Sequence, residues 1–148
     1  MSDPTAITPE QVALVKETWG KVIPISETAS RLFYDRLFET SPHLAPMFYG
    51  VDLVSQREKL VKAINMVVVS LERIEELVPS IRELGKRHLN YGAEEAHYAE
   101  VGSALLWTLE TGLDEAWSED AEEAWTTAYQ LLAGVMLDGA REGIMSAA

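Results

Sequence analysis

Apolar residues recur every three or four positions along most of the chain, which is the period of an amphipathic helix. Thr8, Pro9 and Gln11 form a capping-box pattern with proline at the first helical position. They predict a helix from residue 9 to about residue 20. A second helix over about 27–40 is predicted by apolar positions at helical spacing, namely Ala29, Leu32, Phe33 and Leu37.

Two further helices are predicted before the middle of the chain. Ser41 and Pro42 start a short third helix, which ends near Phe48 and is broken by Tyr49 and Gly50. A long helix follows over about 53–73, which at 1.5 Å per residue is roughly 30 Å long. Its buried stripe is predicted to consist of Leu60, Ile64, Val67, Val68 and Leu71.

The second half of the chain predicts three more helices. A shorter and less regular helix covers about 75–89, contains Pro79 and Gly85, and is closed by Gly92. Another opens at the acidic pair 94–95 and stops at Gly112. The last is capped by residues 118–120 and runs to about Glu142.

These elements predict one all-α domain over residues 1–148, with six to eight helices that pack at steep angles. Residues 1–7 and about 143–148 are expected to be tails. The sequence contains no internal repeat, linker or low-complexity tract.

Composition narrows the class of protein. The 148 residues are 47% hydrophobic, which suits one folded domain and argues against disorder. The absence of cysteine excludes disulfides, iron–sulfur clusters and thiolate chemistry. The N-terminal segment does not resemble a secretory signal, and the longest apolar run, residues 66–69, is too short to cross a bilayer. We therefore expect a soluble cytoplasmic protein that does not associate with a membrane.

The formal net charge of −12 makes nucleic acid a poor partner, since binding it depends on lysine and arginine contacts to phosphate. The charge is uneven: seven of the twelve basic residues lie within 57–87, and none lies within 89–140. Most of these charges are expected to be solvated helix faces. The alternative is that some basic groups meet an anionic ligand.

His88 is the main candidate for metal chemistry, because the chain has three histidines and no cysteine. It ends the segment 84–88 (LGKRH) and lies 32 positions after Gln56. A histidine that faces another helix across an apolar gap can hold a flat, iron-containing cofactor. The alternative is an ordinary structural histidine. His43 and His97 do not occupy comparable positions, and His43 is expected to be exposed.

Several segments together resemble the globin superfamily, and within it the haem domain of flavohaemoglobins and single-domain bacterial globins. Their order and spacing are specific, with 14 positions from Tyr34 to Phe48, 8 from Phe48 to Gln56 and 32 from Gln56 to His88. The resemblance covers nearly the whole chain and implies a globin fold around a haem pocket. The segments are 32–38 (LFYDRLF), 41–42 (SP), 47–48 (MF), 55–60 (SQREKL), 84–88 (LGKRH), 97–102 (HYAEVG) and 124–126 (AWT).

The resemblance assigns His88 as the proximal ligand of the iron of haem b, with its second ring nitrogen hydrogen-bonded to an acceptor. Tyr98 and Glu142 match the hydrogen-bonding group that lies behind this histidine in flavohaemoglobins. A carboxylate in that position increases electron density at the iron. Glu142 lies near the chain end, and the alternative is that it is only a surface acid.

On the other side of the haem, the resemblance places Tyr34 and Gln56 at the sixth coordination site. Hydrogen bonds from a phenol and an amide would stabilise the partial negative charge on bound O₂ by about 1–3 kcal/mol. Because glutamine is a poor iron ligand, the iron is expected to be pentacoordinate. The remaining residues expected at the haem are Phe48, Lys59, Leu60, Leu84 and Val101. Lys59 is expected to reach a haem propionate, as Lys86 or Arg87 also could. For each of these three the alternative is an ordinary solvated charge.

The resemblance leaves three functions open. The first is a globin that reversibly binds O₂, and also NO and CO. The second is a nitric oxide dioxygenase that converts NO and O₂ to nitrate. The third is a haem-based gas sensor, which is disfavoured because no effector domain is recognisable. Flavohaemoglobins carry flavin and nicotinamide domains, but this sequence has no G-x-G-x-x-G motif, so turnover is expected to need an external reductase.

Overall fold

The computed structural model describes residues 7–90 and 93–147, with side chains described for 7–89 and 93–142. The described residues form helices and short 3-10 segments, with no strand. The α-helices are α1 (Pro9–Val22), α2 (Ser26–Thr40), α3 (Leu53–Val69), α4 (Ile74–Asn90), α5 (Glu95–Leu113) and α6 (Glu119–Ala147). The 3-10 segments are η1 (Ile23–Ile25), η2 (Pro42–Phe48), η3 (Leu71–Arg73) and η4 (Asp114–Ala116).

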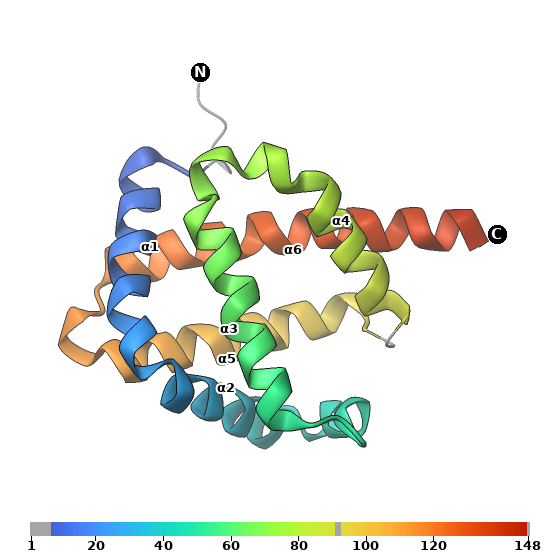
Figure 1. Ribbon diagram of the computed structural model, residues 1–148, viewed down its shortest axis with the longest axis horizontal. Helices are drawn as coiled ribbons and strands as arrows, with labels where there is room; N and C mark the ends of the chain where they lie inside the picture. Colours follow the sequence, from blue (N-terminus) through green and yellow to red (C-terminus); the bar gives the residue numbers. More distant parts are fainter. Residues whose placement is uncertain (1–6, 91–92, 148) are drawn as a thin grey trace.

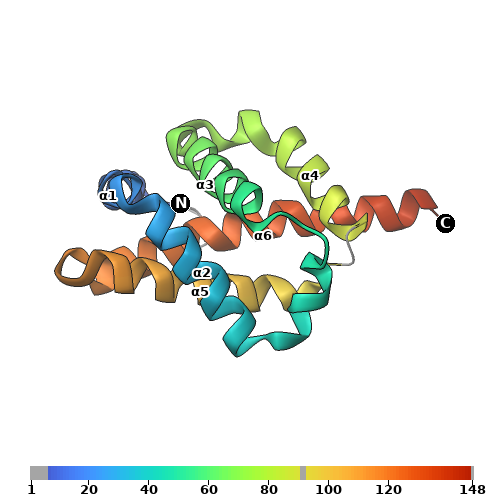
Figure 2. The same ribbon diagram turned by 60° about the horizontal axis from the view of Figure 1, so that its bottom comes forward.

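The helices cross one another at steep angles, as the sequence predicts (Figure 1). In that view α6 runs across the whole molecule and α3 crosses in front of α5 and α6. The C-terminal end of α4 and the segment η2 lie at the same end of the molecule in both ribbon views (Figures 1 and 2). The prediction of an all-α fold with six to eight helices is confirmed.

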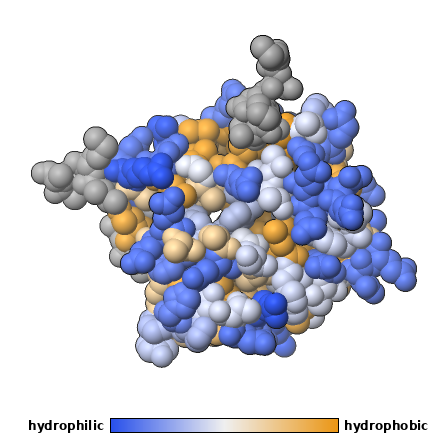
Figure 3. Space-filling model, turned by 180° about the vertical axis from the view of Figure 1, so that it is seen from behind, coloured by the Kyte–Doolittle hydropathy of each residue, from blue (hydrophilic) through white to orange (hydrophobic). Residues whose placement is uncertain are grey.

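The main core lies where α1, α3, α5 and α6 meet. Its largest side chains are Trp19 and Trp125, whose ring centroids are 6.1 Å apart. The buried indole nitrogen of Trp125 donates a hydrogen bond of 2.8 Å to the Thr18 hydroxyl, so the polar atoms of this core are paired. The face seen in Figure 3 interleaves hydrophilic and apolar areas.

Local signals predicted the first two helices well. The Thr8 side chain accepts from the Gln11 backbone N–H, and the Gln11 side chain accepts from the Thr8 N–H, which is the reciprocal capping box. The helix then continues to Val22, two residues beyond the predicted end at Gly20. The predicted short third helix is the 3-10 segment η2, and Gly50 after it has a φ of 81°, a conformation that favours glycine.

Two predicted boundaries were wrong, and one helix, whose bounds were predicted to within one residue, differs from the prediction in its regularity. The long helix ends at Val69 and is followed by η3, since Ser70 leaves the helical conformation. The following helix is neither short nor irregular: α4 has 17 residues, as many as α3, with Pro79 inside it. The last helix continues from Glu142 to Ala147. Gly92 and residues 1–6, part of the predicted tail, lie outside the described residues.

The sequence predicts that no segment crosses a membrane. No helix in the described part of the chain combines the length and the apolar composition needed to cross a bilayer.

Candidate functional site

A second, smaller core surrounds Tyr34 between α2, η2, α3 and α5. The Tyr34 ring packs edge-on against Phe33 and Phe48, with centroids 4.9 and 5.7 Å away, and against Phe38 at 6.0 Å. This Tyr34 cluster consists of the buried residues Phe33, Tyr34, Leu37, Leu44 and Ala104 and the half-buried residues Phe38, Met47, Phe48, Leu60, Val101 and Leu105. The structure therefore brings four of the predicted site residues together, namely Tyr34, Phe48, Leu60 and Val101.

Gln56 joins this cluster through a hydrogen bond. Its side-chain nitrogen, at the start of α3, donates to the Tyr34 hydroxyl oxygen over 3.2 Å. Because the phenol oxygen accepts from the amide, the phenol proton remains for another acceptor. Burial raises the pKa of Tyr34 above its ordinary value of 10.0, and the hydrogen bond from Gln56 opposes this only in part. Tyr34 is therefore a protonated hydrogen-bond donor throughout the neutral range.

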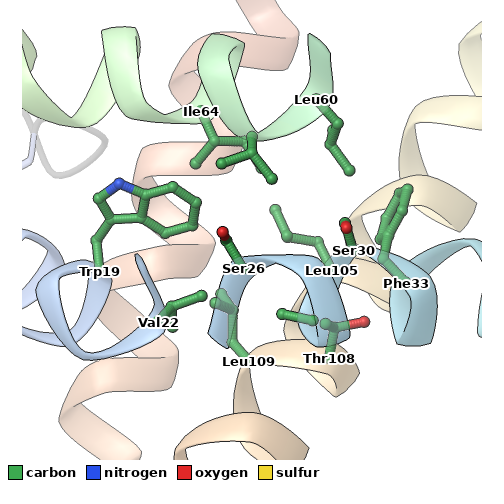
Figure 4. A pocket seen from close by; sticks show the side chains of 12 residues that line it. Trp19, Val22, Ser26, Ser30, Phe33, Leu60, Ile64, Leu105, Thr108 and Leu109 are labelled. Carbon is green, nitrogen blue, oxygen red and sulfur yellow. The ribbon is translucent and has the colours of Figure 1, made fainter. Parts of the chain in front are cut away.

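An apolar cavity adjoins the cluster between α1, α2, α3 and α5 (Figure 4). Phe33, Leu60 and Leu105 belong to both the cluster and the cavity wall. Two of the three hydroxyl side chains in this wall donate to carbonyls of their own helix: the Ser30 hydroxyl to Glu27 and the Thr108 hydroxyl to Ala104. The wall is otherwise mostly apolar, with Ser26 as the third hydroxyl.

His88 lies near the C-terminal end of α4 and is half-buried. Its Nδ1 atom is 2.8 Å from the backbone carbonyl oxygen of Leu84, one turn earlier in the helix. Since a carbonyl can only accept, Nδ1 carries the proton of this bond, and the lone pair of the neutral ring is on Nε2. That tautomer is the one in which Nε2 can bind a metal while Nδ1 fixes the ring orientation. Leu84, also half-buried, is thus the residue that orients His88.

Tyr98 and Glu142 lie on different helices and have different partners. Tyr98 is half-buried on α5, burial raises the pKa of its phenol, and its backbone carbonyl accepts a 2.5 Å hydrogen bond from the Tyr129 hydroxyl. Glu142 is exposed on α6, where one of its carboxylate oxygens lies 3.1 Å from the Arg82 guanidinium of α4. The predicted roles of both residues behind His88 stay predictions.

The other charged and histidine candidates are exposed or half-buried. Lys59 is exposed on α3 and Lys86 forms an ion pair of 3.7 Å with Glu83. His43 is exposed, as expected, and its Nε2 lies 2.9 Å from the Glu100 carboxylate. His97 accepts the Glu94 backbone N–H at the start of α5, which completes a capping box. His43 and His97 therefore both have structural partners.

Sequence reasoning missed most of the side chains that enclose Tyr34. Phe38 is one helical turn after Tyr34, a spacing that indicates a shared helix face. Leu44, Ala104 and Leu105 approach from other elements, and no local pattern predicts such contacts. The positive charge of Arg57, next to Gln56, also opposes the rise that burial causes in the Tyr34 pKa. The only sequence signal for this effect of Arg57 was its position beside Gln56, a predicted site residue.

The buried tyrosines predict how stability depends on pH. Burial raises the pKa of Tyr34, Tyr98 and Tyr129 above 10.0 in the folded protein. The stability that these phenols contribute is therefore fully present below pH 10 and is lost as pH rises above it, because the unfolded tyrosines ionise first. Denaturant unfolding at stepped pH, with phenolate absorbance followed in parallel, should show ionisation of these groups together with unfolding. A Tyr34 phenolate signal near pH 10 in the folded protein, identified by its loss in Tyr34→Phe, would contradict this.

Comparison with known proteins places this chain in a family. A profile for the family Globin matches residues 31–136. The chain is 30% identical over 145 residues to a flavohemoprotein of Vibrio cholerae, covering 94% of this chain and 35% of that protein. It is 27% identical over 128 residues to a flavohemoprotein of Bacillus subtilis, covering 85% and 32%. The chain thus spans about a third of the length of these relatives.

A solved structure gives the same result for the fold. A bacterial globin from Campylobacter jejuni superposes with a TM-score of 0.80 at 27% identity, covering 91% of this chain and 97% of that one. The profile match extends over more than half of the sequence. On both grounds this chain belongs to the globin family, and membership of that family implies that it binds haem.

Proposed function

We propose that this protein binds haem b through His88 and reversibly binds O₂, and also NO and CO, on the side where Tyr34 and Gln56 lie. The observation that carries the proposal is the hydrogen bond from Gln56 to the buried Tyr34 phenol. Burying a polar group costs free energy unless it is hydrogen-bonded, and Gln56 and Tyr34 meet this need by bonding to each other within an otherwise aromatic and aliphatic cluster. The bond uses the phenol oxygen as acceptor and leaves the phenol proton for another group. A small polar ligand is such a group.

The residues present fit a haem. The Nδ1 proton of His88 is bonded to the Leu84 carbonyl, so the ring has the tautomer that a metal ligand requires. The Tyr34 cluster offers aromatic and aliphatic surface, including Phe48, Leu60 and Val101, to a flat apolar group. When bound, haem supplies an iron that takes diatomic gases as ligands.

The protein side chains would then have separate roles. Tyr34 would donate a hydrogen bond from its phenol to the ligand, and Gln56 orients that phenol by donating to its oxygen. Phe48 would pack against the haem, while Leu60, one turn after Gln56, would limit the space for the ligand. Lys59, exposed on the same helix, would bind a propionate, and Leu84 and Val101 would contact the porphyrin. Tyr98 would support His88, and Glu142 is a second candidate for that role.

Replacing Tyr34 by phenylalanine tests this assignment. The loss of one hydrogen bond to a partly charged ligand, worth about 1–3 kcal/mol, should accelerate O₂ release roughly 5- to 150-fold. Stopped-flow displacement of O₂ by CO measures this rate. Tyr49→Phe is a matched control, because it removes the same hydroxyl from a tyrosine that is 78% exposed, and it should leave the rate unchanged. Equal release rates in wild type and Tyr34→Phe would refute the role of Tyr34.

The second candidate function is nitric oxide dioxygenation, in which NO and O₂ are converted to nitrate. It is favoured by the two relatives named flavohemoprotein and by the Tyr34–Gln56 pair, which stabilises negative charge on bound O₂. This activity needs repeated reduction, for which we propose a separate reductase as partner. Under this proposal the chain supplies the ligand-binding site and the partner supplies electrons.

Turnover distinguishes the enzyme from the binding protein. The oxygenated protein is mixed with excess NO and O₂, with and without a flavin reductase and NADH, and nitrate is measured per haem. An enzyme should form many nitrates per haem when the reductase is supplied, and Tyr34→Phe should form nitrate roughly 5- to 150-fold more slowly, since the lost interaction is worth about 1–3 kcal/mol. One nitrate per haem under both conditions would leave reversible gas binding as the function.

A further inference from the structure

The placement of α4, the helix that carries His88, depends on few buried groups. Among its described side chains only Ile81 and the position of Gly85 are fully buried, and the others are half-buried or exposed. Its main packing partner is α6. Figures 1 and 2 both show α4 lying against the C-terminal half of α6. What fixes α4 on α6 therefore decides where His88 lies.

Two glycines allow the backbones of these helices to touch. A Cβ atom added to Gly85 would come closer than 3.0 Å to the backbone carbonyl of Met136 on α6. A Cβ added to Gly139 of α6 would approach the backbone carbonyl of Arg82 on α4 equally closely. Real Cβ atoms do not come that near, and backbone atoms cannot turn aside as a flexible side chain can. Any larger residue at either glycine has to separate the helices.

The two contacts are reciprocal and define a register. Gly85 contacts the backbone of Met136, which lies three positions before Gly139. Gly139 in turn contacts the backbone of Arg82, which lies three positions before Gly85. The Arg82 guanidinium also pairs at 3.1 Å with Glu142, three positions after Gly139. That ion pair is nearly half exposed on both sides and contributes little by itself. The glycine contacts therefore set the distance between the helices, and the ion pair follows the same register.

His88 is directly linked to this contact. It lies three residues after Gly85, close to the same face of the helix. Its ring nitrogen Nδ1 is hydrogen-bonded to the backbone carbonyl of Leu84, the residue next to Gly85. A displacement of the turn that contains Gly85 consequently moves both the imidazole and the group that orients it.

We propose that Gly85 and Gly139 are positioning residues for His88, and that their backbone contacts set the distance and orientation of its imidazole relative to the haem iron. The inference rests on the proposed function, in which His88 is the iron ligand.

The test uses Gly85→Ala and Gly139→Ala, with Gly134→Ala as the matched control. Gly134 is on α6, like Gly139, but a Cβ there meets nothing within 4 Å, so the control carries the same change in helix propensity without the clash. Gly139→Ala also serves where Gly85→Ala does not fold, and because it lies on the other helix it alters His88 only through the interface.

The first readout is amide hydrogen exchange of the haem-free protein. Exchange across α4 should become roughly tenfold faster or more in Gly85→Ala and Gly139→Ala, because overpacking weakens the docking of this helix, while Gly134→Ala exchanges like wild type. The second readout is the iron–histidine stretching band of the haem-loaded protein in resonance Raman spectra. It should shift in both interface variants and stay in place in the control.

The outcomes distinguish the positioning role of the two glycines from the proposed function, in which His88 is the iron ligand. A shifted band together with faster α4 exchange supports the positioning role. Faster exchange with an unchanged band would overturn the positioning role alone, since the contact would then dock the helix without setting the imidazole. Wild-type exchange in both interface variants would overturn the contact itself. A wild-type protein that takes up haem without an iron–histidine band would instead overturn the proposed function.

Discussion

The hydrogen bond from Gln56 to Tyr34 is the interaction around which the site is organised. It connects α3 to α2 at a point where the phenol is surrounded by the rings of Phe33, Phe38 and Phe48. Without it, the buried phenol would be fixed by packing alone and its proton could point in several directions. With it, an oxygen lone pair is engaged and the proton is available to a ligand, which is how Tyr34 would act in the proposed binding of O₂.

Low polarity around this bond gives it strength. Burial keeps the Tyr34 phenol protonated by raising its pKa, and the neighbouring cavity is lined by carbon, with the Ser30 and Thr108 hydroxyls bonded to their own helices. Interactions with developing charge are stronger where water is excluded. The net charge of −12 is therefore a property of the surface, whereas the site is built from neutral donors.

Sequence reasoning succeeded where the determining interactions are local. The capping box at Thr8 and the apolar period of residues 26–40 follow from neighbours within a few positions, and those helices were predicted closely. It placed α4 to within one residue but was wrong in expecting an irregular helix, because Pro79 and Gly85 indicate irregularity locally, whereas α6 accommodates Gly85 through a contact 51 positions away. Tyr34, Gln56 and His88 were found through family spacing, but the Arg82 partner of Glu142 was not, since no local pattern encodes it.

The central claim is that His88 alone binds the haem iron. Haem titration of His88→Ala, followed by Soret absorbance, tests it most directly, with His43→Ala and His97→Gln as controls, since the structure gives those histidines other partners. Wild type and both controls should bind one haem per chain with the same spectrum. His88→Ala should lose the wild-type Soret band and bind haem at least tenfold more weakly, as the loss of a metal ligand implies. An unchanged spectrum and affinity in His88→Ala would contradict the account.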